Sequence, residues 1–254
     1  MVRTRKRIDQ ILVEEKLAPS REKARQMIES GMVFAGGFRV EKPGTLISGK
    51  AIEVRGNENP YVSRGGLKLE KALQAFEVSP EGMTALDAGA STGGFTDCLL
   101  RHGAAKVYAV DVGYGQLAWK LQQDPRVIRV ERINIRYLEF SRIGEKADLI
   151  TADLSFISLT LVLKNLSRFL KESGTMITLV KPQFEAGREE VGRGGIVRDP
   201  ETRLQTVRKV IQFGETIGLS AMGVEESPIT GQKGNIEFLV CFKPSISARK
   251  EFIH

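Results

Sequence analysis

A glycine-rich segment that opens with an acidic residue, "LDAGASTGGFTD" at residues 86–97, has the residue types of a cofactor-binding loop. Gly89, Ser91 and Gly94 keep the spacing of the dinucleotide loop G-x-G-x-x-G, but serine replaces the central glycine that admits a pyrophosphate. Asp87 would repel a pyrophosphate and could instead pair with an ammonium group. S-adenosylmethionine has such a group and no phosphate. The segment therefore favours S-adenosylmethionine, and a structural glycine turn without a ligand stays open as the alternative.

A second acidic residue follows at a distance typical of nucleoside-binding folds. Asp111 lies in the apolar run "KVYAVDV", 24 residues beyond Asp87. An acidic side chain at that point can accept hydrogen bonds from both hydroxyl groups of a ribose. NAD and S-adenosylmethionine both contain that ribose, so Asp111 indicates a nucleoside cofactor without distinguishing the two.

Four charged residues that lie far apart in the sequence form a candidate catalytic set: Lys68, Asp153, Lys181 and Glu237. Asp153 and Lys181 each come at the end of an apolar run, so both should lie at one rim of a sheet, beside the Asp87 loop. In such a cluster a second cation and partial burial would make one lysine easier to deprotonate, while the acids orient it. That lysine could activate a sugar hydroxyl for attack on a methyl group. Each residue could also be only a solvated charge at a strand end.

The tetrapeptide "DLSF" at residues 153–156 supports a different acceptor. It is similar to the D-P-P-Y tetrapeptide of enzymes that methylate exocyclic base amines, although Leu154 and Ser155 replace the prolines. Methylation of a base nitrogen therefore remains an alternative to methylation of a hydroxyl.

Positive charge is concentrated at the amino end of the chain. Residues 1–60 contain 12 Lys+Arg and 8 Asp+Glu, which gives +4 of the formal net charge of +7. Such clustering suits contacts to the phosphates of a nucleic acid, although a solvated face of mixed charge would look similar. The residues we expect to contact RNA are Arg3, Arg5, Arg7, Ser20, Arg21, Lys23, Arg25, Arg39 and Arg64.

The elements that must position these residues divide the chain into two parts. We expect a small α+β domain at residues 1–59, with a helix from Ile8, a second helix between Ser20 and Gly31, and a hairpin at Gly36-Gly37. A linker at residues 60–65 leads to a larger domain at residues 66–254.

The larger domain alternates strand-like and helical segments, which predicts an α/β doubly wound sheet with an antiparallel hairpin at one edge. The charged, glycine-rich stretch 182–199 has the length of a functional loop or lid. Strands are expected at 84–90, 106–112, 126–131, 147–154, 175–181, 219–226 and 236–242, and helices at 95–103, 158–173 and 200–218.

Composition excludes several classes of function. With only two histidines and two separated cysteines, zinc chemistry and histidine-based acid/base catalysis are disfavoured, and no metal is expected. No apolar run has the length of a signal peptide core or of the ~20 residues that span a membrane. We therefore expect a cytoplasmic protein with an anionic partner and no membrane contact.

Longer stretches resemble a known family. "RIDQILVEEKLAPSREKARQMIESGMVFAGG" resembles the S-four RNA-binding fold, and "YVSRGGLKLEKAL", "LDAGASTGGFTDCLL", "ADLSFISL" and "LVKPQFEAG" resemble the TlyA family of ribosomal RNA 2'-O-methyltransferases, whose catalytic domain is similar to the FtsJ type. The resemblance implies a Rossmann-like methyltransferase domain that uses S-adenosylmethionine. Its implied substrates are cytidines in RNA of the small or large ribosomal subunit, or of assembled subunits. Members are often labelled haemolysins, but neither an apolar span nor an amphipathic insertion surface supports lytic activity here.

The resemblance also implies roles for individual residues. Lys68, Asp153, Lys181 and Glu237 would form the Lys-Asp-Lys-Glu tetrad that serves 2'-hydroxyl methylation. Asp111 would bind the cofactor's ribose, and Asn134 would lie near its adenine. The complete expected cofactor set is Asp87, Gly89, Ala90, Ser91, Gly93, Gly94, Phe95, Asp111, Val112, Asn134 and Asp153.

Overall fold

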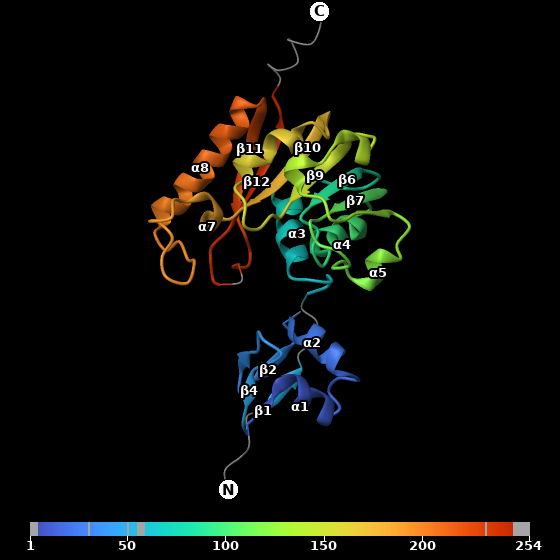
Figure 1. The fold of residues 1–254 in the computed structure, drawn as a ribbon, viewed down its shortest axis with the longest axis vertical. Helices are drawn as coiled ribbons and strands as arrows, with labels where there is room; N and C mark the ends of the chain where they lie inside the picture. The colour runs from blue at the N-terminus through green and yellow to red at the C-terminus, as the bar shows by residue number, and fades with distance from the viewer. Residues whose placement is uncertain (1–4, 30, 50, 55–58, 232, 246–254) are drawn as a thin grey trace, which may run out of the picture. The chain divides into compact units, whose positions relative to one another are not determined.

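The chain folds into two compact units, residues 1–64 and residues 65–254 (Figure 1). A computed structural model describes residues 5–29, 31–49, 51–54, 59–231 and 233–245. Arg3, one of the expected RNA contacts, lies outside the described residues. Helix α3 (Gly65–Ala75) already begins at the last residue of the expected linker.

Within its described residues, the first unit contains two helices and two small sheets. Ser20 Oγ accepts a hydrogen bond from the backbone N of Lys23 at 3.1 Å, so Ser20 caps the second helix as predicted. Gly36 and Gly37, with φ of +60° and +82°, form the turn of the predicted hairpin. Its elements are β1 (Lys6–Arg7), α1 (Ile8–Glu14), α2 (Arg21–Glu29), β2 (Val33–Ala35), β3 (Phe38–Arg39), β4 (Leu46–Ile47) and β5 (Ile52–Val54).

A separate hydrophobic core holds this unit together. Ile8 and Leu12 of α1 pack with Ala24 and Ile28 of α2 against Val33 of β2, and all five side chains are buried. The helical spacing of these apolar residues gives each helix one buried face and leaves most charged residues outside, with Asp9 of α1 as a fully buried exception.

The second unit is built on a seven-stranded sheet with the order β11-β12-β10-β9-β6-β7-β8. Strand β12 runs antiparallel to both β10 and β11, and the pairs from β10 to β8 are parallel. The predicted doubly wound sheet with an antiparallel edge hairpin is therefore confirmed. The strands are β6 (Thr84–Ala88), β7 (Lys106–Val110), β8 (Val127–Val130), β9 (Ala147–Ala152), β10 (Leu170–Val180), β11 (Leu219–Glu226) and β12 (Phe238–Pro244).

Helices of very different lengths connect these strands. Helix α8 matches the helix predicted at 200–218, and α4 matches the one predicted at 95–103. The helices are α3 (Gly65–Ala75), α4 (Gly94–Arg101), α5 (Trp119–Gln122), α6 (Leu163–Ser167), α7 (Pro182–Glu185) and α8 (Pro200–Thr216), with 3-10 turns η1 (Ile135–Tyr137), η2 (Phe140–Arg142) and η3 (Leu159–Leu161).

The helix predicted over residues 158–173 is wrong. That segment contains η3 and the five-residue α6, and β10 begins at Leu170, which pairs with Ala147. Apolar residues at helical spacing occur on both sides of the boundary because Leu166 and Leu170 both belong to the core. Burial alone therefore produced the pattern of one long helix. Helix α3 is not among the predicted elements, and the glycines at its start weaken its helical signature.

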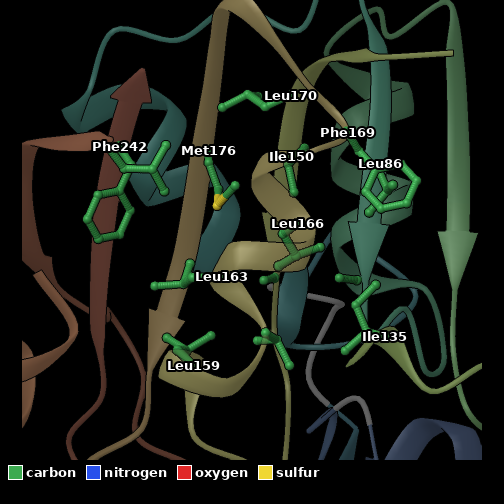
Figure 2. Packing of buried hydrophobic residues seen from close by; sticks show 14 of the residues in the cluster. Leu86, Ile135, Ile150, Leu159, Leu163, Leu166, Phe169, Leu170, Met176 and Phe242 are labelled. Atoms are coloured by element: carbon green, nitrogen blue, oxygen red, sulfur yellow. The ribbon is translucent and has the colours of Figure 1, made fainter. Parts of the chain in front are cut away.

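The main core lies on one face of the central strands (Figure 2). Leu86, Ile150, Met176 and Phe242, from β6, β9, β10 and β12, are all fully buried. Leu163, Leu166 and Phe169 cover these strand residues from the segment around α6. The core therefore fixes the strands whose ends carry the candidate site.

The sheet has its topological switch point at β6. This strand pairs with β7 on one side and with β9 on the other. In open α/β sheets ligands bind in the crevice beyond the carboxyl ends of the strands at such a point. The loops after β6 and β9 are therefore the place to look for a cofactor site.

Candidate active site

Two lysine–carboxylate pairs occupy the carboxyl rim of the sheet. Lys181 Nζ lies 2.6 Å from Asp153 Oδ1 and donates a hydrogen bond to Ser155 Oγ at 3.0 Å. Lys68 Nζ donates to Glu237 Oε2 at 2.6 Å. The four residues that the sequence singles out as a catalytic set thus form two ion pairs.

The strand register brings the two pairs together. Asp153 follows β9 directly, and Lys181 follows β10. Val180 pairs with Phe238 in the antiparallel ladder, so the next position along places Lys181 beside Glu237. Lys68 reaches Glu237 from α3. All four charges therefore gather at one end of three adjacent strands.

Burial makes these pairs different from ordinary surface ion pairs. The side chains of Lys68 and Lys181 are each 10% exposed, Glu237 is 3% exposed and Asp153 is 21% exposed. A buried ion needs a partner to offset its lost hydration, and each lysine has one carboxylate. The cluster is close to electrically neutral and opens to solvent mainly at Asp153.

Asp87 lies beneath the glycine loop, at the end of β6. Its carboxylate is fully buried and accepts hydrogen bonds from Thr96 Oγ1 at 2.6 Å and from Thr151 Oγ1 at 3.0 Å. Burial raises the pKa of Asp87 to about 6, the two hydroxyl groups oppose that rise, and the charge of Asp153 adds to it. A cation bound above the loop would relieve this penalty.

The loop itself adopts backbone conformations that favour glycine. Gly89 has a φ of +85°, and a Cβ there would overlap the backbone O of Asp153. Gly93 has a φ of +98°, and a Cβ there would overlap the side chains of Leu117 and Leu121. The loops after β6 and β9 therefore touch, and Gly89 is what permits that contact.

Asp111 joins the glycine loop to the segment after β7. Its Oδ2 accepts a hydrogen bond from Ser91 N at 2.8 Å, and its Oδ1 accepts one from Gly113 N at 2.7 Å. A pocket lies between these two segments, and it is lined by Ala90, Ser91, Ala109, Asp111, Gly113, Gln116, Leu117, Arg129 and Glu131.

Sequence reasoning named three residues of this pocket and missed the others. Glu131 follows β8 directly, just as Asp111 follows β7, and its Oε1 accepts a hydrogen bond from Gly115 N at 3.0 Å. Its place at a strand end is the signal that could have identified it. Gln116 and Leu117 carried no comparable signal, because their loop has no recognisable motif.

Several expected cofactor residues lie away from the pocket lining. Asn134 Oδ1 accepts a hydrogen bond from Arg136 N and so caps the turn η1, and Val112 is 68% exposed. Phe95 is buried in α4, which begins at Gly94. Their roles in cofactor binding stay predictions.

An exposed aromatic side chain stands next to the lysine–carboxylate cluster. Phe156 is 91% exposed and has a φ of +63°, a rare conformation for a bulky residue. Its ring centroid lies 5.1 Å from that of Phe184, and Lys181 Nζ lies 6.0 Å from the Phe184 ring.

The basic residues of the first unit are distributed over its helices and hairpin. Arg7, Arg21 and Arg25 surround the buried carboxylate of Asp9. Arg5, Ser20, Lys23 and Arg39 are exposed, and Arg64 is partly buried. These positions are compatible with RNA contacts, which stay predictions.

Family models assign both units. Residues 61–244 match the FtsJ-like methyltransferase model, and residues 6–52 match the S4 domain model. The chain belongs to the TlyA family of FtsJ-like methyltransferases. The S4 domain lies within the first unit, and the FtsJ-like domain covers the seven-stranded sheet and the two lysine–carboxylate pairs.

Members of this family cover nearly the whole chain. The 16S/23S rRNA (cytidine-2'-O)-methyltransferase TlyA of Mycobacterium tuberculosis is 46% identical over 93% of this chain and 89% of its own length. Hemolysin A of Brachyspira hyodysenteriae is 41% identical over 93% of this chain and 99% of its own length. A solved structure from Streptococcus thermophilus, provisionally named a hemolysin, is 44% identical, has a TM-score of 0.76, and covers 95% of this chain and 89% of that one.

The residues of the FtsJ-like domain fit S-adenosylmethionine. The glycine loop contacts the backbone of Asp153, the buried Asp87 can balance a positive charge, and Asp111 borders the pocket with both carboxylate oxygens on backbone N–H groups. Within the described residues no helix is long and apolar enough to cross a membrane.

Proposed function

We propose that the protein transfers a methyl group from S-adenosylmethionine to the ribose 2'-hydroxyl of a cytidine in ribosomal RNA. The observation that carries this proposal is the position of Lys181 Nζ, held between Asp153 and Ser155 at the rim beside the glycine loop. The relatives named as cytidine-2'-O-methyltransferases support the choice of acceptor. Since ribosomal RNA is the substrate, the activity belongs to the cytoplasm.

The cofactor supplies an electrophilic methyl group on a positively charged sulfur. We assign its methionine part to the loop of Gly89, Ala90, Ser91 and Gly93, its charge balance to Asp87, and its ribose to Asp111. The polar lining formed by Gln116, Arg129 and Glu131 would complete the pocket.

Lys181 prepares the acceptor hydroxyl. A hydroxyl is a weak nucleophile until its proton is removed or strongly hydrogen-bonded, and transfer requires its oxygen in line with the methyl group. Lys181 Nζ would orient the 2'-oxygen by a hydrogen bond and, once it has released one of its own protons to solvent, would take the hydroxyl proton as a neutral amine while the C–O bond forms. The C–S bond of the cofactor would break in the same step, and its sulfur would keep the electron pair. Asp153 holds Lys181 in place, and the pair Lys68–Glu237 supports it from the neighbouring strand.

The exposed Phe156 supports a nucleotide as the acceptor. Proteins that act on RNA commonly stack unpaired bases on exposed aromatic rings. The ring of Phe156 is open to solvent and adjoins Phe184, whose ring is close to Lys181. A base stacked there would present its ribose near the Lys181 amine.

The acidic side chain that base methylation would require already pairs with Lys181. Asp153 and Ser155 belong to the "DLSF" tetrapeptide, and both contact Lys181 Nζ. We therefore favour the hydroxyl over an exocyclic amine, and we assign docking on folded ribosomal RNA to the S4 domain.

Product analysis tests this assignment. Purified protein is incubated with labelled S-adenosylmethionine and with unmodified small or large ribosomal subunits, and the RNA is digested to nucleosides. We expect label in 2'-O-methylcytidine. Label on a base amine would refute the 2'-hydroxyl assignment, and no transfer to either subunit would refute the enzymatic one.

A further inference from the structure

One buried carboxylate organises three arginines of the S4 domain. Asp9 is fully buried near the start of α1, and it lies 3.0 Å from Arg7 Nε, 3.0 Å from Arg21 Nη2 and 3.8 Å from Arg25 Nε. Arg7 binds it with two parallel hydrogen bonds, from Nε and from Nη2. The arginines come from β1 and from successive turns of α2.

The charges of this group do not balance. One arginine would neutralise Asp9, yet three guanidinium groups gather on it and repel one another. Their side chains remain 40%, 52% and 55% exposed for Arg7, Arg21 and Arg25. A second anion at the exposed side would relieve the excess of positive charge.

The geometry of the arginines suits a phosphate. Planar guanidinium groups bind phosphate oxygens with paired hydrogen bonds, provided that their planes are held in the right orientation. Asp9 fixes the plane of Arg7 from one side, and the backbone of Gly44 lies against the same group, since a Cβ at Gly44 would be 3.6 Å from Arg7 Nη1. Surface arginines without such support would have to lose side-chain entropy on binding.

We propose that Arg7, Arg21 and Arg25 form a single phosphate-binding site for the RNA backbone, and that Asp9 is the residue that positions them. The inference rests on the proposed docking of ribosomal RNA by the S4 domain. It assigns a negatively charged residue a favourable role in binding a negatively charged ligand. Simple electrostatics predicts the opposite, because removing a negative charge should strengthen RNA binding.

Two variants of the full-length protein, each lacking one negative charge, test whether Asp9 favours RNA binding or opposes it. Asp9→Asn removes the organising charge, and Glu14→Gln removes an exposed charge of the same helix, where Glu14 pairs with Lys6 at 2.7 Å. Binding to ribosomal subunits and steady-state methyl transfer are measured for each. We expect Asp9→Asn to raise the Kd and the KM for RNA about tenfold, equivalent to ~1.4 kcal/mol, with kcat unchanged. Glu14→Gln should bind as tightly as the wild type or more tightly. Equal or tighter binding by Asp9→Asn would overturn the proposal.

A second variant is needed if Asp9→Asn fails to fold. Circular dichroism of the full-length variant and limited proteolysis within residues 1–64 would show such a failure. Arg7→Lys keeps the charge and leaves Asp9 ionised, but it loses the paired hydrogen bonds. We expect Arg7→Lys alone to weaken RNA binding. Where Asp9→Asn does fold, adding Arg7→Lys to it should weaken RNA binding little further, because the two residues act as one unit. Unchanged binding by Arg7→Lys, or additive losses in the double variant, would overturn the proposal.

Deletion of residues 1–59 distinguishes an error in the proposed RNA docking by the S4 domain from an error in the proposed role of Asp9. If this deletion leaves RNA binding intact, docking by the S4 domain is wrong. If the deletion weakens binding but Asp9→Asn does not, only the role of Asp9 is wrong.

Discussion

Lys68 and Glu237 are 169 positions apart in the sequence, yet their side chains meet at 2.6 Å and are almost completely buried. The contact joins the first helix of the FtsJ-like domain to the residue that precedes its last strand. Since Lys181 and Glu237 directly adjoin the paired residues Val180 and Phe238, the Lys68–Glu237 pair also supports the amine we assign to the acceptor hydroxyl.

Breaking this pair should cost both stability and activity. Glu237→Gln leaves the Lys68 ammonium buried without its carboxylate, and we expect it to lower the free energy of unfolding by about 3 to 5 kcal/mol. Chemical denaturation measures this loss. The matched control is Glu225→Gln, which removes the exposed partner of Lys71 on the same helix and should cost less than about 1 kcal/mol. Equal losses in the two variants would show that burial does not strengthen the Lys68–Glu237 pair.

Replacing Lys181 should separate binding from transfer. Lys181→Ala removes the group that orients the acceptor, so we expect methyl transfer to fall by about 10²- to 10⁴-fold, while calorimetry shows unchanged affinity for S-adenosylmethionine. Strand β10 supplies the control, because Lys171 pairs with Asp148 at 2.8 Å near its opposite end. Lys171→Ala should retain transfer. Wild-type rates in Lys181→Ala would remove this residue from the mechanism.

A single methyl group at Gly89 should disrupt the contact between the two loops. Gly89→Ala combines a positive φ with a Cβ that overlaps the backbone O of Asp153, so both cofactor affinity and transfer should be lost. At Gly144, φ is also positive, at +77°, but a Cβ added there would meet nothing within 4 Å. Gly144→Ala should therefore cost only the backbone strain of about 1 to 2 kcal/mol and leave transfer intact. Cofactor titration of both variants tests the difference.

The buried Asp87 should make stability depend on pH. Its pKa rises from 3.8 to about 6 on folding, so the native state binds the proton more tightly than the unfolded state. This contribution to stability is complete below about pH 4 and is lost as the pH rises through about 6. Asp87→Asn should remove that dependence and raise the free energy of unfolding at neutral pH by up to about 3 kcal/mol.

The same variant should lose the charge that we assign to the cofactor's ammonium group. We therefore expect Asp87→Asn to be more stable than the wild type at neutral pH and to bind S-adenosylmethionine poorly. Denaturation curves across the range and calorimetry at neutral pH check both expectations. Unaltered cofactor affinity would contradict the assignment of Asp87.

The rim of the sheet could be predicted from sequence because parallel strands end at a common edge. Asp87, Asp153 and Lys181 each lie at or just beyond the end of an apolar run, and the parallel arrangement of the strands brings these ends to one edge of the sheet. The pairing of Lys68 with Glu237 depends on how α3 packs and on the register of β12. Neither is encoded in a local pattern, and α3 itself was not predicted.

Asp9 shows a different limit of sequence reasoning. Its neighbours Arg7, Arg21 and Arg25 were predicted as RNA contacts because they are basic, but the carboxylate that gathers them has no distinctive local pattern. A buried polar residue on an otherwise apolar helix face becomes informative only once its partners are known.

The boundary between α6 and β10 depends on pairing with β9, so the periodicity of residues 158–173 could not locate it.

The order of the elements along the chain has a consequence for synthesis on the ribosome. Domains generally fold in the order in which they emerge, so the S4 domain can form long before Glu237 has been translated. The cluster around Lys68 and Lys181 is completed only when Glu237 and β12, the last strand of the sheet, have been synthesised. On the proposed function, a nascent or truncated chain would hold ribosomal RNA without methylating it. The modification would thus be reserved for chains that have been translated through the last strand.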